Sequence, residues 1–235
     1  TIQDLYVEFD RVIGKITNSF DMEDPNFSFL VMSDHGFSSF KRQVNLNTWL
    51  HQNGYLSLKD ETKPSTVGFF ENVDWDNTKA YFLGINSLYL NLRGREKFGS
   101  VSANEEAILL RSLKEDLHKF VDPANDVNVV SDILVVPKAE KLENPHAPDM
   151  IIGWNLGYRS SWESVLGGMS SSAVRDNDDK WSGDHCIAPR FVPGVLIANQ
   201  KIRGGNVSLK DITASILWKF NITLPTHMSG KSVFN

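Results

Sequence analysis

Two Asp-His pairs are the residues of this chain whose types could do chemistry together. Asp34 and His35 follow the apolar run 27–33, and Asp184 and His185 stand in a glycine-flanked loop far along the chain. A carboxylate and an imidazole at the end of a strand can bind one divalent cation, a ligand set that suits zinc and is also used with manganese. The alternative is structural, with the aspartates forming turns, His35 in the core and His185 exposed in a loop. The repetition of the pair favours a metal site.

A second group of candidates lies in the segment 155–187, which is rich in Gly, Ser, Trp and Asp. Arg159 could hold an anionic group in a bidentate manner. The aromatic residues Tyr158, Trp162 and Trp181 could line a substrate pocket, since such pockets are commonly lined by aromatic rings. Alternatively they form a small core that holds the segment in place. A loop this long is usually functional or disordered, and its aromatic content favours function.

The remaining reactive side chains have weaker cases. Arg93 and Arg95 could bind an anion, but surface ion pairing with Glu96 or with the acidic stretch 175–179 is the favoured interpretation. Cys186 stands beside His185, yet no Asn or second base completes a nucleophilic site, so we interpret it as an inert, small hydrophobic residue. The glycine-rich nucleotide motifs and the GxSxG motif of α/β-hydrolases are absent from the sequence.

Hydrophobic periodicity and capping residues predict the elements that must position these side chains. Four helices are expected, at 2–20, 45–54, 102–120 and 208–220, and strands at 27–33, 127–136, 149–154 and 194–199, with a hairpin over 78–92. Apolar strands alternating with helices predict an α/β fold with a largely parallel sheet flanked by helices.

The domain organisation follows from the same pattern. We expect one α/β catalytic domain over 1–235, a small antiparallel insertion or cap-like segment at 41–100 that carries the hairpin, and a long active-site loop at 155–187. In parallel sheets, ligands bind beyond the carboxyl ends of the strands, where Asp34 and His35 are expected.

Composition excludes several classes of partner. The 235 residues carry a net charge of -5, so no broad positive field is available for duplex nucleic acid. No apolar run is long enough for a membrane span. The single cysteine excludes an internal disulfide and leaves the compartment open, with a soluble, cytoplasmic protein slightly favoured.

The segments "VMSDHGF" and "GDHCIAPRFVPGVLIAN" resemble the alkaline phosphatase superfamily, in its type I phosphodiesterase/nucleotide pyrophosphatase branch. Within that branch the chain is similar to a group of uncharacterised predicted phosphohydrolases and phosphomutases, which also share the blocks "VNLNTWL", "YLNLRGRE" and "APDMIIGWNLGYRSSWE". The resemblance implies an alkaline-phosphatase-like sheet with two divalent metals, zinc or manganese, at the strand ends. It assigns Asp34 and His35 to one metal and His185 to the other. Asp184 fills a variable position and is not assigned as a ligand.

The same resemblance implies a small phosphate-ester substrate, which Arg159, Tyr158 and Trp181 would contact. The nucleophilic Thr or Ser of the family, a further metal-binding Asp and an Asp-x-x-x-His pair precede its equivalent of the first helix and match nothing here. We therefore expect the C-terminal part of a longer phosphohydrolase, inactive by itself.

Its nucleophile and N-terminal strands would precede Thr1, leaving an exposed sheet edge through which the chain could form a homo-oligomer. The alternatives are a phosphomutase or sulfatase of the same superfamily, and a non-catalytic domain that binds carbohydrate or protein.

Overall fold

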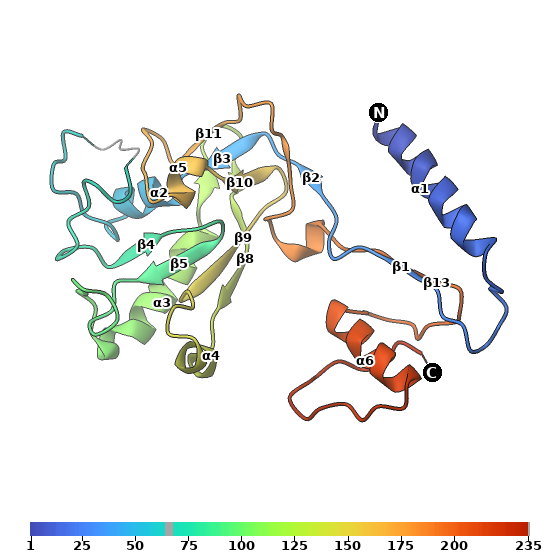
Figure 1. Cartoon of the computed structure of the whole chain (residues 1–235). Helices are drawn as coiled ribbons and strands as arrows, with labels where there is room; N and C mark the ends of the chain where they lie inside the picture. The colour runs from blue at the N-terminus through green and yellow to red at the C-terminus, as the bar shows by residue number, and fades with distance from the viewer. Residues whose placement is uncertain (64–67, 235) are drawn as a thin grey trace. The chain divides into compact units, whose positions relative to one another are not determined.

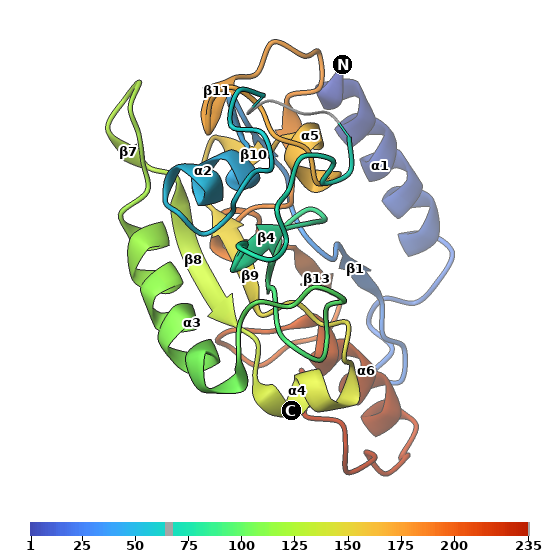
Figure 2. The ribbon, with the colours of Figure 1, turned by 90° about the vertical axis from the view of Figure 1, so that its left-hand side faces the viewer.

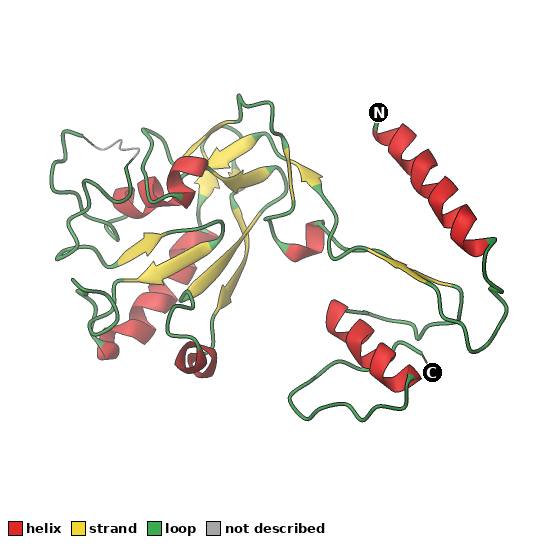
Figure 3. Cartoon of the chain, viewed as in Figure 1, coloured by secondary structure: helices red, strands yellow, loops and turns green. Residues whose placement is uncertain are grey.

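The computed structural model describes residues 1–63 and 68–234, which form two compact units (Figure 1). Unit 1 combines Thr1–Asp34 with Gly194–Asn235, and unit 2 is the continuous segment His35–Pro193. Helices and short strands are joined by long loops in both (Figure 3). The expectation of one catalytic domain over the whole chain stays a prediction.

Unit 1 contains two helices and a two-stranded ribbon. Helix α1 (Ile2–Thr17) begins at a capping box, and helix α6 (Leu209–Lys219) begins at another. Strand β1 (Leu30–Met32) pairs antiparallel with β13 (Leu196–Ala198). The predicted helices and the two predicted strands are therefore present, although each strand is only three residues long.

Unit 1 leaves much of its apolar surface exposed. Helix α1 has no buried residue, and Phe9 on its apolar face is 60% exposed. Strands buried on both faces were expected, but Met32 in β1 and Ile197 in β13 are exposed. Burial on both faces needs a sheet that is covered by a layer on each face. In the part of the chain that the structure describes, β1 and β13 form a ribbon of two strands only.

The larger sheet of unit 2 has the strand order β4-β5-β9-β8 and is antiparallel throughout. Its strands are β4 (Ala80–Phe82), β5 (Ser87–Leu90), β8 (Val130–Val135) and β9 (Met150–Trp154). Helix α3 (Ala103–His118) lies along β8 (Figure 2). The core between them includes Leu88, Leu90, Leu113, Leu117, Met150, Ile152 and Trp154, all fully buried. The predicted hairpin at 78–92 is confirmed as β4 and β5.

A second, three-stranded sheet carries several candidate residues. Its central strand β3 (Arg42–Val44) pairs in parallel with β10 (Tyr158–Ser160) and antiparallel with β11 (Val174–Asp176). Among the strands of the described residues, β3 and β10 form the only parallel ladder. The prediction of a largely parallel sheet is therefore wrong, while the mixed α/β class holds. The apolar strands expected in the parallel sheet pair antiparallel instead, β1 with β13 and β8 with β9.

Short elements complete unit 2. They are β2 (Ser38–Ser39), α2 (Leu46–Gln52), β6 (Val121–Asp122), β7 (Val127–Asn128), α4 (Lys138–Glu143), α5 (Trp162–Val165), β12 (Gly183–Asp184) and a 3-10 turn at Pro189–Phe191. Segment 155–187 therefore contains β10, α5, β11 and β12 and is not one irregular loop. Its role as an active-site segment, like the insertion at 41–100, stays a prediction.

Candidate functional site

Two short strands bring together histidines that are distant in the sequence. Strand β12 pairs antiparallel with β2, so that Asp184 lies opposite Ser38. His35 precedes β2 and His185 follows β12, and their imidazole rings stack with centroids 3.7 Å apart and an interplanar angle of 11°. The predicted partners His35 and His185 thus meet within unit 2.

Phe37 completes this cluster and was not predicted from the sequence. Its ring meets both imidazoles edge-on, at 5.4 Å from His35 and 5.3 Å from His185. The phenyl ring itself is 66% exposed. Nothing in the sequence distinguishes Phe37, which follows the Asp34-His35 pair, from a phenylalanine of the core, so only the fold identifies it.

The ring nitrogens of the two histidines differ in their surroundings. Nδ1 of His35 lies 3.0 Å from the backbone oxygen of Gly36, a distance at which Nδ1–H can donate to that oxygen. Nδ1 of His185 is buried and has no hydrogen-bond partner among the residues that the structure describes. Buried polar atoms normally have a partner. Nδ1 of His185 is therefore a nitrogen that fits a divalent cation.

Gly36 is required by a close backbone approach. Its N–H donates to the oxygen of Val192 at 3.0 Å, and a Cβ at this position would lie 2.9 Å from the oxygen of Pro193. The φ angle of Gly36 is not positive. The glycine is therefore explained by space beside His35 and not by a turn that only glycine can form.

Asp184 shapes the turn that carries His185. Its Oδ1 accepts from the backbone N–H groups of His185 at 2.7 Å and Cys186 at 3.1 Å. Its other oxygen, Oδ2, lies 3.1 Å from Nε of Arg159. Burial raises the pKa of Asp184, but the two N–H groups and the Arg159 charge outweigh it, so the pKa lies below its ordinary value. The carboxylate is thus ionised and committed to the backbone.

Cys186 lies next to these groups. A carboxylate oxygen of Asp184, a ring nitrogen of His185 and Sγ of Cys186 all lie within 4.8 Å of one another. This arrangement could contribute to a metal site. Burial and, secondly, the Asp184 charge raise the pKa of the Cys186 thiol to about 11. The thiol is therefore protonated near neutral pH and is a weak nucleophile.

Arg159 extends from β10 and its side chain is only 5% exposed. The guanidinium carbon lies 5.1 Å from the ring centre of Phe40 and 4.6 Å from that of Trp162. The contact with Asp184 is an ion pair without hydrogen-bond geometry, since Nε has no hydrogen-bond partner among the described residues. A cation between two rings gains cation–π stabilisation.

The other two predicted substrate-binding residues lie in different environments. Tyr158 is buried, and its hydroxyl donates to Oδ2 of Asp122 at 3.1 Å. Trp181 is 62% exposed, and its backbone oxygen accepts from Asn177. Trp162, and not Trp181, is the tryptophan that contacts Arg159.

Asp34 is the chain neighbour of His35 but belongs to unit 1. There it lines a hollow of about 180 Å³ together with Ser33, Gly194 and Leu209. Its position relative to the two imidazoles stays a prediction.

Arg95 is engaged in ion pairs. Its Nε lies 2.7 Å from Glu96 and its Nη2 lies 2.7 Å from the fully buried carboxylate of Asp149. These contacts agree with the ion-pairing interpretation of this residue.

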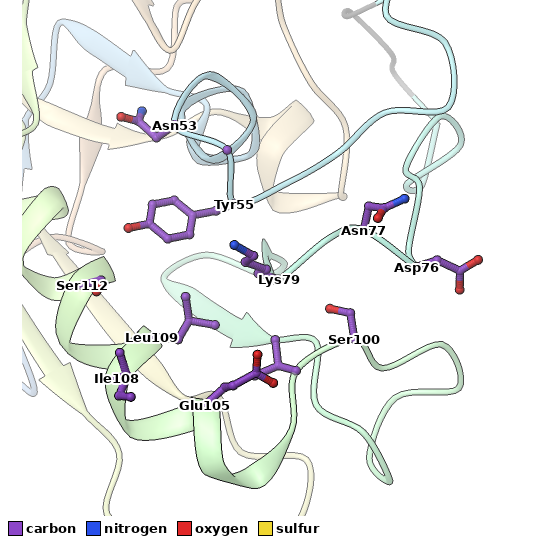
Figure 4. Close-up of a pocket in the computed structure, with 12 residues that line it drawn as sticks. Asn53, Tyr55, Asp76, Asn77, Lys79, Ser100, Glu105, Ile108, Leu109 and Ser112 are labelled. Atoms are coloured by element: carbon purple, nitrogen blue, oxygen red, sulfur yellow. The ribbon is translucent and has the colours of Figure 1, made fainter.

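A separate cleft of about 640 Å³ lies between the residues that follow α2 and the first turns of α3 (Figure 4). The Lys79 ammonium points between the Tyr55 ring and Leu109. None of the predicted site residues lines this cleft.

Comparison with known proteins gives the family. Residues 1–170 match the model of the type I phosphodiesterase / nucleotide pyrophosphatase family, which is most of the chain. The chain belongs to this family, whose members hydrolyse phosphate esters and typically depend on divalent metals. The matched range includes Asp34, His35 and Arg159 and ends before His185.

No curated protein and no solved structure matches the chain. Among the helices of the described residues, none is long and apolar enough to cross a membrane.

Proposed function

We propose that the protein is a metal-dependent phosphohydrolase that acts on a phosphodiester, a pyrophosphate or a phosphomonoester through a two-metal site. Asp34 and His35 would bind one ion and His185 the other. The observation that supports this proposal is the pair of stacked imidazoles, delivered from two distant segments, with Nδ1 of His185 buried and unpartnered among the described residues.

Two bound zinc or manganese ions would activate the nucleophile and neutralise charge on the transferring phosphoryl oxygens. The residues of this chain would hold and orient the ions. Donation from Nδ1–H of His35 to the oxygen of Gly36 fixes the ring orientation, and Phe37 restricts both rings from the side. We assign no nucleophile here, and the expectation that one precedes Thr1 stays a prediction.

The proposed substrate contacts have uneven support. Arg159 offers a positive charge close to the His185 turn, and Trp162 covers its guanidinium with a ring that is 51% exposed. Trp181 is exposed enough to stack on a ligand, whereas the Tyr158 hydroxyl is bound to Asp122. These side chains would contact the phosphate ester or its leaving group.

Hydrolysis assays test the proposal. The protein, expressed from its complete gene, would be stripped with a chelator, reloaded with Zn²⁺ or Mn²⁺, and given an aryl phosphodiester, a nucleotide pyrophosphate, an aryl phosphomonoester and an aryl sulfate. We expect metal-dependent hydrolysis of one or more phosphate esters, and a loss of at least about 100-fold in His35→Ala and His185→Ala. His118→Ala is the matched control, because His118 is exposed on α3.

Hydrolysis that survives chelation, or that persists in both histidine variants, would contradict the proposal. Phosphoryl transfer within a sugar phosphate would favour the phosphomutase, cleavage of the sulfate ester alone the sulfatase, and saccharide or protein binding without turnover the binding domain. Stoichiometric, tight binding of two zinc ions by residues 1–235 alone would contradict the expectation that further ligands precede Thr1.

Self-association through an exposed sheet edge and a cytoplasmic location also remain proposals. The exposed ribbon β1–β13 supports the first, because an unpaired strand edge can pair with another chain. Sedimentation of the purified protein would measure it, and a monomer at all concentrations would contradict it.

A further inference from the structure

We propose that Arg159 and Asp184 form a positioning pair that fixes the backbone turn carrying His185 and holds its imidazole against that of His35. This inference rests on the proposed metal-binding role of His185 and explains how that residue is oriented.

The first step is the turn itself. Oδ1 of Asp184 accepts from the N–H groups of both His185 and Cys186, so one carboxylate oxygen determines the direction in which the chain leaves β12. A side chain that bonds to the backbone of the next two residues restricts their φ and ψ angles. The side chain of His185 starts from this restricted backbone.

The second step is the restraint on the carboxylate. Oδ2 of Asp184 lies 3.1 Å from Nε of Arg159, and the two side chains are 10% and 5% exposed. Within the described residues, Asp184 is the only carboxylate in contact with Arg159. Such a buried charge is costly without its partner, so the two charges depend on each other.

The third step is the anchor of the arginine. Strand β10 pairs in parallel with β3, with Arg159 opposite Gln43, and the guanidinium lies against the rings of Phe40 and Trp162. A planar guanidinium between aromatic rings loses this packing when it is replaced by lysine. The sheet thus fixes Arg159, Arg159 holds Asp184, and Asp184 shapes the turn of His185.

Two measurements on the 235-residue chain test the inference. The first uses no metal. Stacking of two imidazoles shifts the carbon-bound ring protons of His35 and His185 upfield in the NMR spectrum, and this shift should be present in the wild type. We expect it to be lost in Asp184→Ala and Arg159→Gln, and to persist in Arg190→Gln. Arg190 is the control because it lies in the same region but is exposed and pairs with Asp132.

The second measurement is zinc affinity by competition with a chelating dye. We expect Asp184→Ala and Arg159→Gln to raise the zinc Kd about 10–100-fold, the usual effect of removing a group that orients a ligand. Arg159→Lys should recover part of the loss. If the two residues act as a pair, the double variant should lose no more affinity than the worse single variant. Each single variant leaves one buried charge without its partner, whereas the double variant removes both charges and should therefore fold. Near-ultraviolet circular dichroism would show whether each variant is folded.

The outcomes separate the two proposals. Unchanged ring-proton shifts in folded Asp184→Ala would overturn the positioning role, whatever the metal data show. Additive losses in the double variant would also overturn it. Lost shifts together with a zinc Kd that is insensitive to His185→Ala would support the positioning role and instead refute the metal-binding role of His185.

Discussion

The buried carboxylate of Asp122 offers the sharpest test of what holds unit 2 together. Its side chain is fully buried and accepts from Nε and Nη2 of Arg42 at 2.7 and 2.8 Å. It also accepts from the N–H of Ala124 at 3.0 Å and from the hydroxyl of Tyr158 at 3.1 Å. Through these contacts Asp122 connects strands β3, β6 and β10. We expect Asp122→Asn to destabilise unit 2 strongly.

The size of the effect follows from this geometry. Removing one partner of a buried ion pair typically costs about 3–5 kcal/mol, because the other charge stays buried. The lower end, about 3 kcal/mol, applies here because the Arg42 side chain is 14% exposed and keeps a second partner, Asp176, at 2.6 Å. With a urea m-value of about 3 kcal/mol/M, the midpoint of unfolding should fall by about 1 M.

Tryptophan fluorescence in urea measures this change, because five of the six tryptophans lie in unit 2. Asp176→Asn is the control, since it removes the other partner of the same guanidinium but from a site that is 77% exposed. An exposed ion pair contributes about 1 kcal/mol or less. Equal effects of the two substitutions would refute the argument that burial sets the cost.

The same carboxylate should make stability depend on pH. Burial raises the pKa of Asp122, but its bonds to Arg42 and Ala124 outweigh this, and the pKa lies below the ordinary value of 3.8. Because the folded-state pKa is depressed, the stabilisation is complete above the unfolded-state value and is lost as the pH falls through the folded-state value. The difference between wild type and Asp122→Asn should therefore be constant from neutral pH down to about 5 and shrink below about 4. A difference that grows on acidification would contradict the sign.

Three further predictions concern the site and its surroundings. Gly36→Ala should destabilise unit 2 by about 1–3 kcal/mol, because its Cβ would lie 2.9 Å from a backbone oxygen. Gly183→Ala is the control and should leave the stability unchanged, because no atom lies within 4 Å of the added Cβ. Similar urea midpoints for both variants would refute the close-approach explanation. Cys186, with a pKa of about 11, should react with iodoacetamide far more slowly in the folded chain than in the unfolded chain at pH 8. The labelling rate of the folded chain should rise about tenfold per pH unit up to this pKa. Fast labelling of the folded chain at pH 8 would contradict this prediction. Tyr158→Phe removes the hydroxyl that donates to Asp122 and should lower the free energy of unfolding by about 1 kcal/mol. A raised KM for the phosphate ester with unchanged stability would instead assign Tyr158 to substrate binding.

The parts of the fold that depend on local sequence were predicted well. Helix α3 begins where Ser102 and Glu105 form the expected capping box, and α2 begins where the Asn45 side chain accepts from the N–H of Thr48. Capping bonds involve residues three apart, so a short stretch of sequence contains all the information. The hairpin β4–β5 is also a local feature.

Strand pairing was not predicted, because it depends on residues far apart in the chain. The apolar runs that became β1 and β13 look like strands of a buried parallel sheet, yet they pair with each other in an antiparallel ribbon. The hydrophobic pattern indicates that a segment forms a buried strand, but it does not specify which strand it pairs with or whether the pairing is parallel or antiparallel.

The candidate site was predicted in part for the same reason. His35 and His185 were recognised from their acidic neighbours and meet as rings in the fold. Phe37 was missed, because nothing in the sequence distinguishes it from a core phenylalanine. Trp162 was named as a candidate pocket residue, but its contact with Arg159 depends on the fold and was not predicted. The structure also shows what Asp184, a variable position in the family resemblance, does in the turn: its Oδ1 accepts from the backbone N–H groups of His185 and Cys186.

The hydrogen bond from Gly36 to Val192 has a consequence for the modularity of this protein. It joins the second residue of unit 2 to the second-last, so the unit begins and ends at one place. Segments whose ends meet tolerate excision and circular permutation well. The stretch from His35 to Pro193 could therefore be produced as a separate piece, or rejoined through a short linker and opened at a surface loop. Since His35 and His185 lie near that meeting point, closing the ends would itself restrain the distance between the two imidazoles.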